Sequence, residues 1–162
     1  IDTINKMTYV DFCAHLRQPN IPPGGQDSVK KVIKEVPLFS NSIVLDSGCN
    51  TGYVAREIAR STGSTVIGID INEEMVRVAN SKNGIGTFPG TTKFIQGDSM
   101  NLPFPDNYFD LIICGGSTAF MDNLRKAIEQ YIEKTKLFGY IAEIEFTYHT
   151  NPTDELMNKV KL

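Results

Sequence analysis

Short apolar runs alternate along this chain with segments whose apolar residues recur at helical spacing. Three of the runs are almost continuously apolar, as in strands that helices cover on both faces. The five predicted strands are Ser42–Asp46, Thr65–Asp70, Thr92–Gln96, Phe109–Cys114 and Tyr140–Tyr148. Alternation of this kind predicts an α/β fold, a Rossmann-like doubly wound and mostly parallel sheet flanked by helices.

Helices are predicted between these strands and before the first one. They run from about Asp27 to Val36, from Thr51 to Thr62, from the N-cap Asn72, from Asp122, and over about Asn5–Leu16. Gly63 can supply a left-handed cap where the second ends. The fourth is expected to bury Leu124, Ala127, Ile128, Tyr131 and Ile132.

The chain divides into two parts, residues 1–26 and residues 27–162. The first part holds the N-terminal helix and a stretch rich in proline and glycine, Pro19–Gly25. That stretch is either a plain linker or a loop that folds over the mouth of a ligand site, since loops carry function in α/β folds. The second part is the predicted core domain.

The composition of the chain excludes several classes of protein. The chain has 162 residues and a net charge of −3, without the basic stripe that nucleic-acid binding needs. Three cysteines form no CxxC pair, so we expect neither a disulfide framework nor a metal site. No run reaches the roughly 18 apolar residues of a membrane span. A cytoplasmic protein with no membrane partner is therefore expected.

The loop after the first strand carries the first chemical signal. A buried strand ends at Asp46, and Gly48 and Gly52 follow in a loop that opens a helix. Glycine lets the backbone turn sharply and approach a ligand, and a helix N-terminus presents free N–H groups. Ligands bind such sheets at the carboxyl ends of the strands. The dinucleotide fingerprint GxGxxG is absent.

The next two strand ends add acidic residues. Asp70 can accept hydrogen bonds from both hydroxyls of a ribose, and Ile71 can lie against an adenine face. The alternative is that Asp70 only caps a helix, a role for which Asn72 is better placed. Asp98, after the third strand, can accept from an adenine amino group while a neighbouring backbone N–H reads the ring nitrogen.

Together these stretches resemble class I S-adenosylmethionine-dependent methyltransferases, of the small-molecule type that includes the quinone-biosynthesis methyltransferases. The matching segments are Val44–Gly52, Val66–Asp70, Phe94–Met100 and Leu102–Asp110. The last contains the phrase LPFPDNYFD. The resemblance covers about residues 27–146.

The resemblance implies S-adenosyl-L-methionine as cofactor and a role for each matching residue. The positions that match the family's cofactor site are Asp46, Gly48, Asn50, Gly52, Asp70, Ile71, Asp98, Ser99, Met100 and Cys114. The first four wall the methionine part, the next two bind ribose and adenine, and those around Asp98 bind adenine. Cys114 and Gly115 match the strand end that faces the methyl group.

Two features depart from the family's pattern. Asn50 stands where the family commonly has a glycine, and asparagine is the residue other than glycine that best tolerates positive φ. The family's sheet also has two more strands after the fifth, which form a hairpin. We therefore expect a core that is truncated before those strands, and a fifth strand whose open edge invites self-association.

The reaction implied is methyl transfer to a small-molecule acceptor by in-line displacement. The sequence announces no catalytic residue. His149 is a candidate base, although a histidine beyond a strand is often a surface residue, and Tyr9 or Arg17 can contact cofactor or substrate. Methylation of RNA or protein, a noncatalytic cofactor-binding domain, and a nucleotide-dependent oxidoreductase remain alternatives. The missing GxGxxG argues against the last.

Overall fold

The structure is a computed structural model that describes residues 7–8, 12–13, 15–16, 19, 21–83 and 88–146. Of the helix predicted over Asn5–Leu16, residues 12, 13 and 15 are helical. Tyr9, Arg17, His149 and the end of the strand predicted to reach Tyr148 lie outside the described residues.

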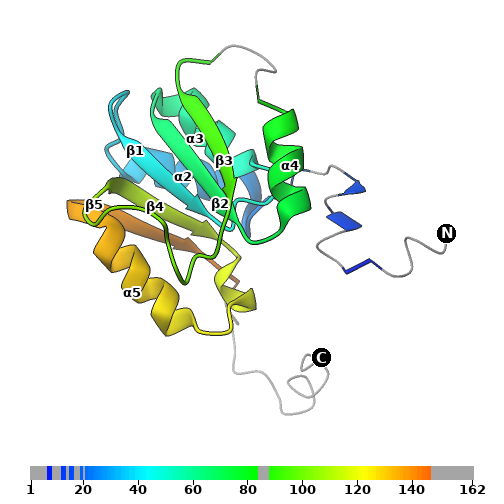
Figure 1. Ribbon diagram of the computed structural model, residues 1–162. Coiled ribbons are helices and arrows are strands. Elements are labelled where there is room, and N and C mark those ends of the chain that lie inside the picture. The colour runs from blue at the N-terminus through cyan, green and yellow to red at the C-terminus, as the bar shows by residue number, and fades with distance from the viewer. Residues whose placement is uncertain are drawn as a thin grey trace.

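Five parallel strands form one sheet, as the alternation predicts (Figure 1). They are β1 (Ile43–Ser47), β2 (Thr65–Asp70), β3 (Thr91–Gln96), β4 (Phe109–Gly115) and β5 (Thr135–Ile144). The order across the sheet is β3-β2-β1-β4-β5, and every neighbouring pair is parallel. The winding direction therefore reverses between β1 and β4, and a ligand crevice is expected outside the carboxyl ends of the strands there.

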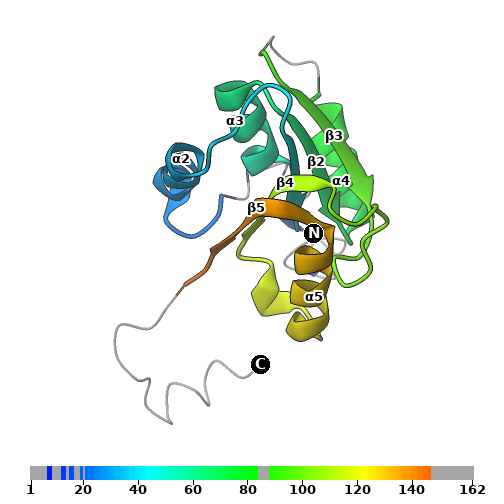
Figure 2. The same ribbon diagram turned by 90° about the vertical axis from the view of Figure 1, so that its left-hand side faces the viewer.

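Helices cover both faces of this sheet (Figure 2). They are α2 (Gly25–Glu35), α3 (Tyr53–Thr62), α4 (Glu73–Ser81), a short 3-10 helix η2 (Thr118–Phe120) and α5 (Leu124–Lys134). One apolar cluster joins residues of α2, α3 and α4 to Val44, Val66 and Leu111 of the strands. A second joins α5 to the next strand positions, such as Leu45 and Ile112. Successive strand residues thus serve opposite faces.

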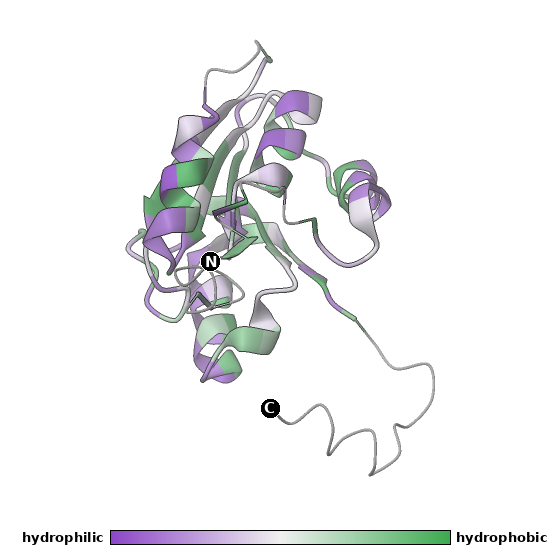
Figure 3. Cartoon of the chain, turned by 90° about the vertical axis from the view of Figure 1, so that its right-hand side faces the viewer, coloured by the Kyte–Doolittle hydropathy of each residue, from purple (hydrophilic) through white to green (hydrophobic). Residues whose placement is uncertain are grey.

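The distribution of hydrophobic and hydrophilic residues follows this arrangement of helices around the sheet. Hydrophobic residues colour the inner strands, whereas the helices mix hydrophobic stripes with hydrophilic outer faces (Figure 3). In the described part of the chain, no helix has both the length and the apolar character needed to cross a bilayer.

Helix ends agree with the sequence predictions in two cases. Gly63 follows α3 with a φ of 75°, and its N–H donates to the carbonyl of Ala59. The side chain of Asn72 accepts from the N–H of Met75 and so caps α4. Both caps satisfy backbone groups that a helix terminus otherwise leaves unpaired.

The predicted burial along α5 is partly wrong. Ala127 and Tyr131 are fully buried, but Leu124 and Ile132 are exposed. The helix begins at Leu124 behind the cap Asn123, not at Asp122, so Leu124 lies in the first turn. Ile132 follows Tyr131 by one residue and therefore points about 100° away from the buried stripe.

The predicted bounds of the fifth strand are also wrong. β5 begins at Thr135, directly after α5, because the C-cap residue Thr135 already has an extended backbone. An irregularity follows, since Phe138 has a φ of 65° and the register against β4 shifts between Phe109 and Leu111. Gly139 follows Phe138 inside the strand. Phe138 is 90% exposed as a result.

The LPFPDNYFD phrase has a structural role. The ring of Phe109 packs edge-on against Phe104 at 4.9 Å and against Tyr108 at 5.0 Å. Asp110 joins the starts of two strands, because its Oδ2 accepts from the N–H of Ile43 at 2.7 Å and from Lys136 Nζ at 2.9 Å. This segment therefore fixes where β1, β4 and β5 begin relative to one another.

Removing the Asp110 carboxylate should loosen these strand starts. We expect Asp110→Ala to lower the free energy of unfolding by about 1–3 kcal/mol, because it leaves the Ile43 N–H without its acceptor. Asp110→Asn keeps an acceptor oxygen and should lose clearly less. Urea unfolding followed by circular dichroism measures both, and equal losses for the two variants would contradict this account.

Candidate cofactor-binding site

The turn after β1 is made of residues in left-handed conformations. Gly48, Asn50 and Gly52 have φ values of 71°, 49° and 78°. The prediction that Asn50 adopts positive φ in place of a glycine is confirmed. Its side chain also stabilises the turn, since Nδ2 donates to the carbonyl of Gly48 at 3.0 Å.

The end of β2 holds this turn in place. The N–H groups of Gly48 and Cys49 both donate to the carbonyl of Ile69, at 2.9 and 3.0 Å. The next N–H, that of Asn50, donates to Asp70 Oδ2 at 2.8 Å. Three successive amides of the turn are thus fixed by two adjacent residues of the neighbouring strand.

Asp70 performs part of the capping role that the alternative interpretation gave it. Its Oδ1 accepts from the N–H of Asn72 at 2.9 Å, although the α4 cap itself is the Asn72 side chain. The carboxylate is 8% exposed, and burial raises its pKa although the two N–H bonds oppose the shift. A carboxylate oxygen has more than one lone-pair site, so these bonds leave acceptor capacity for a ligand. Ile71 beside it is 70% exposed.

The loop after β3 turns at Asp98. The Oδ1 atom of Asp98 accepts from the N–H of Met100 at 2.8 Å. The Ser99 hydroxyl points inward and lies 2.6 Å from the hydroxyl of Ser47, the last residue of β1. Ser99 therefore contributes its backbone, rather than its side chain, to any ligand at this edge.

Asp46 lies beneath the turn and is almost completely buried. Its Oδ2 accepts from the N–H of Ala55 in the first turn of α3, at 3.1 Å. Burial raises the pKa of Asp46 to about 7, and the nearby Asp70 carboxylate adds to the shift. This carboxyl group ties β1 to the start of α3.

Close packing explains why glycine stands at position 48 and at position 115, the end of β4. A Cβ on Gly48 would lie 2.3 Å from both Cβ and Oγ of Ser117, so protein fills the space that a side chain would need. A Cβ on Gly115 would lie 2.9 Å from Cβ of Pro22. The proline- and glycine-rich stretch thus packs on the end of β4, which supports the interpretation that it folds over the edge of the site.

Cys114 is buried at the end of β4. Its sulfur lies 2.9 Å from Ser117 Oγ, and burial raises its pKa to about 11, so the thiol stays neutral. The hydroxyl of Thr118 in η2 contacts a carboxylate oxygen of Glu143 in β5 and one of Glu145 just after it, each at 2.5 Å. Burial raises the pKa of Glu143 as well.

Several of these residues are missing from the sequence prediction of the site. Ser47, Ser117 and Thr118 have no motif that marks them, because their partners come from distant elements. Arg56 is also missing: its guanidinium lies over the Phe94 ring at 5.5 Å and donates to the carbonyl of Thr51. The sequence gives no signal for it, because Arg56 precedes Arg60 by four residues and both lie on the polar side of the predicted helix.

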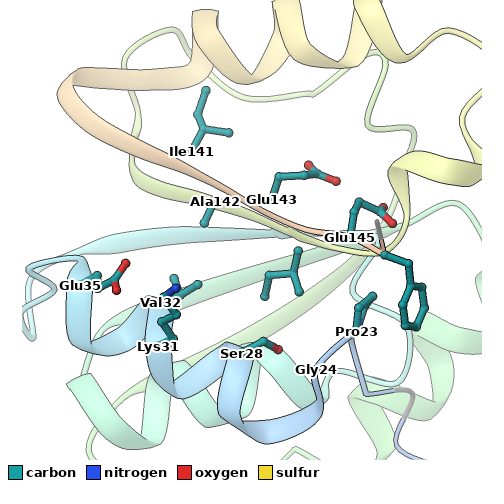
Figure 4. A pocket seen from close by; sticks show the side chains of 12 residues that line it. Pro23, Gly24, Ser28, Lys31, Val32, Glu35, Ile141, Ala142, Glu143 and Glu145 are labelled. Atoms are coloured by element: carbon teal, nitrogen blue, oxygen red, sulfur yellow. The ribbon is translucent and has the colours of Figure 1, made fainter. Parts of the chain in front are cut away.

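A large open groove lies beside the cofactor residues, and its lining includes Glu143 and Glu145. It has a volume of about 670 Å³ and runs between α2 and β5 (Figure 4). Its lining includes Ser28, Lys31 and Glu35 of α2 and the strand residues from Ile141 onward. None of the predicted cofactor residues lines it, so the site is assigned from its hydrogen-bonding groups and not from cavity size.

Comparison with known proteins decides the family. Residues 44–137 match the model of a methyltransferase domain, and this match covers more than half of the chain. The chain belongs to the methyltransferase domain family. The matched segment contains β1 from its second residue, β2, β3 and β4, and with them all the positions from Asp46 to Cys114 that match the family's cofactor site.

Comparison with individual proteins supports the same family assignment. A ubiquinone/menaquinone biosynthesis C-methyltransferase of Stutzerimonas stutzeri is 32% identical over 118 residues, which are 72% of this chain and 45% of the relative. A sterol 24-C-methyltransferase of Gibberella zeae is 38% identical over 102 residues, covering 59% and 26%. The crystal structure of MccD protein superposes with a TM-score of 0.81 at 32% identity, covering 87% of this chain and 62% of that one. The chain thus spans about half the length of the quinone-pathway relative.

The contact between Gly48 and Ser117 leads to a test of the turn. Gly48→Ala places a Cβ against Ser117 at a backbone φ that L-residues rarely adopt, so we expect a loss of roughly 2–5 kcal/mol in the free energy of unfolding. Gly25→Ala is the matched control, because its φ is 67° but nothing lies within 4 Å of the added carbon. Thermal unfolding of both variants would refute the contact if their losses were equal.

The buried Asp46 makes stability depend on pH. The native carboxyl keeps its proton up to about pH 7, whereas an unfolded chain releases it near about pH 4. Between these values the native state binds more protons, so a rise in pH lowers the free energy of unfolding. Asp46→Asn cannot titrate. Its stability relative to the wild type should therefore rise from about pH 4 to about pH 7 and then level off.

Urea unfolding of Asp46→Asn and the wild type at a series of pH values measures this difference. Asp70 is present in both proteins, so its own raised pKa cancels. Parallel pH profiles for the two proteins would show that Asp46 does not keep its proton in the native state.

Proposed function

We propose that this chain binds S-adenosyl-L-methionine at the carboxyl ends of β1, β2 and β3 and directs its methyl group to a small-molecule acceptor. The observation that carries the proposal is the placement of Asp70. Its carboxylate ends β2, holds the turn after β1, and stands beside the exposed apolar Ile71. A charged acceptor next to an apolar platform suits a ribose with its attached base.

The groups present at this edge fit the nucleoside half of the cofactor. Asp70 offers carboxylate oxygens to the ribose hydroxyls, and Asp98 offers its carboxylate to the adenine amino group. Ile71 presents an apolar side chain for a ring face. Acceptors on two strand ends and an apolar surface next to them make a complementary set for an adenosine.

The turn after β1 fits the methionine half. The turn from Gly48 to Gly52, with positive φ at Gly48, Asn50 and Gly52, lies at the carboxyl edge just before the N-terminus of α3. Glycine at positions 48 and 52 keeps side-chain bulk away from a ligand, while the amides of Gly48, Cys49, Asn50 and Gly52 are already bonded within the protein. The buried Asp46 supports the turn from beneath, through its bond to the N–H of Ala55.

The chemistry asks the protein mainly for positioning. A sulfonium methyl is already activated, and its in-line displacement by a nucleophile leaves a thioether, so the methyl group needs no further activation. If the accepting atom carries a proton, a base must take it. Glu143, which lies opposite Cys114 in the sheet, and Glu145, just after β5, are candidates, and His149 remains a predicted one.

The acceptor is proposed to be a small molecule and not RNA. The net charge of −3 provides no basic surface for a phosphate backbone. Gly115-Gly116-Ser117 follows β4, where enzymes that methylate amino groups of nucleic acids carry Asn-Pro-Pro-Tyr. Two of the relatives named above are a ubiquinone/menaquinone biosynthesis C-methyltransferase and a sterol 24-C-methyltransferase, which supports a carbon acceptor.

Asp70 gives the direct test of this proposal. Asp70→Ala should weaken S-adenosyl-L-methionine binding about 10- to 100-fold, because it removes charge-assisted bonds and leaves their partners unpaired. Titration calorimetry measures the affinity, and circular dichroism checks that the variant is folded. Asp27→Ala, an exposed carboxylate on α2, is the control and should bind as the wild type does. Unchanged affinity in folded Asp70→Ala would refute the assignment.

Self-association through β5 is a further prediction. Among the described strands β5 is at the edge of the sheet, with exposed Leu137 and Tyr140 along it. An open edge can pair with a second copy. Ile141→Lys should lower the mass seen by multi-angle light scattering at high protein concentration, since a lysine opposes edge pairing. A wild-type chain that stays monomeric at all concentrations would contradict it.

A further inference from the structure

A chain of three hydroxyl groups crosses the core from α5 to the loop after β3. Tyr131 is fully buried in α5, and its hydroxyl lies 2.7 Å from Ser47 Oγ. Ser47 is also fully buried, and its Oγ lies 2.6 Å from Ser99 Oγ. We call Tyr131, Ser47 and Ser99 the hydroxyl chain.

The hydroxyl chain makes a connection that the sheet does not supply. β2 lies between β1 and β3, so no strand pairing joins Ser47 to the loop after β3. That loop is held at a second point by the same helix, because the N–H of Leu102 donates to Gln130 Oε1 at 3.0 Å. Two adjacent residues of α5 therefore anchor both ends of the segment 99–102.

The position of Asp98 depends on this segment. Its Oδ1 accepts from the N–H of Met100, so the carboxylate is oriented by backbone that Ser99 and Leu102 hold. Met100 lies between these two anchors. Any shift of the loop away from β1 would move the Asp98 carboxylate with it.

The hydroxyls are costly unless they are paired. A buried hydroxyl without a partner loses its hydrogen bonds to water, whereas an apolar side chain of similar shape would pack at this place without that cost. The ring of Tyr131 lies in the second apolar cluster, where phenylalanine would serve packing equally well. Burial raises the pKa of Tyr131, so its hydroxyl keeps its proton and can donate. Beyond packing, the hydroxyl groups hold the loop after β3 in a fixed orientation.

We infer that Tyr131 is a positioning residue for adenine recognition, which through Ser47 and Ser99 fixes the Asp98 carboxylate where it reads the exocyclic amino group. The inference rests on the proposed function and adds to it a residue remote from the ligand. It concerns which base is preferred, and so it has a readout apart from stability.

The test compares two ligands that differ at the base alone. S-adenosylhomocysteine carries the amino group at position 6, and S-inosylhomocysteine carries an oxo group there. The wild type should prefer the adenosyl compound, because a carboxylate accepts from an amino group and repels a carbonyl oxygen. In Tyr131→Phe this preference, measured as the ratio of the two dissociation constants, should fall about three- to tenfold.

Control variants separate positioning from stability. Ser64→Ala removes another buried hydroxyl, which bonds to Thr62 at 2.7 Å at the opposite end of β2, and it should lower stability without changing the ratio. Ser99→Ala should reproduce the effect of Tyr131→Phe. Combining the two should add little more, since both break one chain.

Each possible result either supports or overturns the inference about Tyr131. A reduced ratio in Tyr131→Phe or Ser99→Ala, with the ratio intact in Ser64→Ala, supports the inference. An unchanged ratio in folded Tyr131→Phe and Ser99→Ala overturns it and leaves the proposed function standing. If Tyr131→Phe does not fold, Ser99→Ala alone decides. A wild type that binds both ligands equally overturns the inference and the role of Asp98, and one that binds neither overturns the proposed function as well.

Discussion

The turn after β1 depends on the last two residues of β2. Its amides at Gly48, Cys49 and Asn50 donate to the Ile69 carbonyl and the Asp70 carboxylate, so its left-handed path is set by a neighbouring strand. In a parallel sheet both strands end at the same edge, which makes these bonds possible. The acid proposed to bind ribose is therefore also the acid that shapes the loop proposed to hold methionine.

Packing behind this edge constrains which residues can stand there. Gly48 has no room for a side chain because Ser117 fills that space, and Gly115 has none because of Pro22. Ser117 in turn donates to the carbonyl of Ser47, the middle member of the hydroxyl chain. The ends of β1 and β4 and the loop after β3 are thus joined through short polar side chains. Loops held by such bonds in the absence of a ligand reduce the ordering cost of binding one.

The sequence predicts those features that depend on local chemistry. The parallel sheet, the Gly63 and Asn72 caps and the positive φ of Asn50 follow from residue type and spacing, and the structure confirms them. Features that depend on distant pairing could not be predicted. The start of β5 at Thr135 required the register against β4, and the inward turn of Ser99 required the place of Ser47. The exposure of Ile132 depends on how α5 is rotated against the sheet.

We propose that the cofactor lies across the carboxyl ends of β1, β2 and β3. Amide chemical shifts of the isotope-labelled 162-residue chain, followed by NMR while S-adenosyl-L-methionine is added, test it most directly. We expect the largest changes in amide chemical shift at Gly48–Gly52, Asp70–Ile71 and Asp98–Met100. Changes concentrated along the groove between α2 and β5, or no saturable change at all, would contradict it.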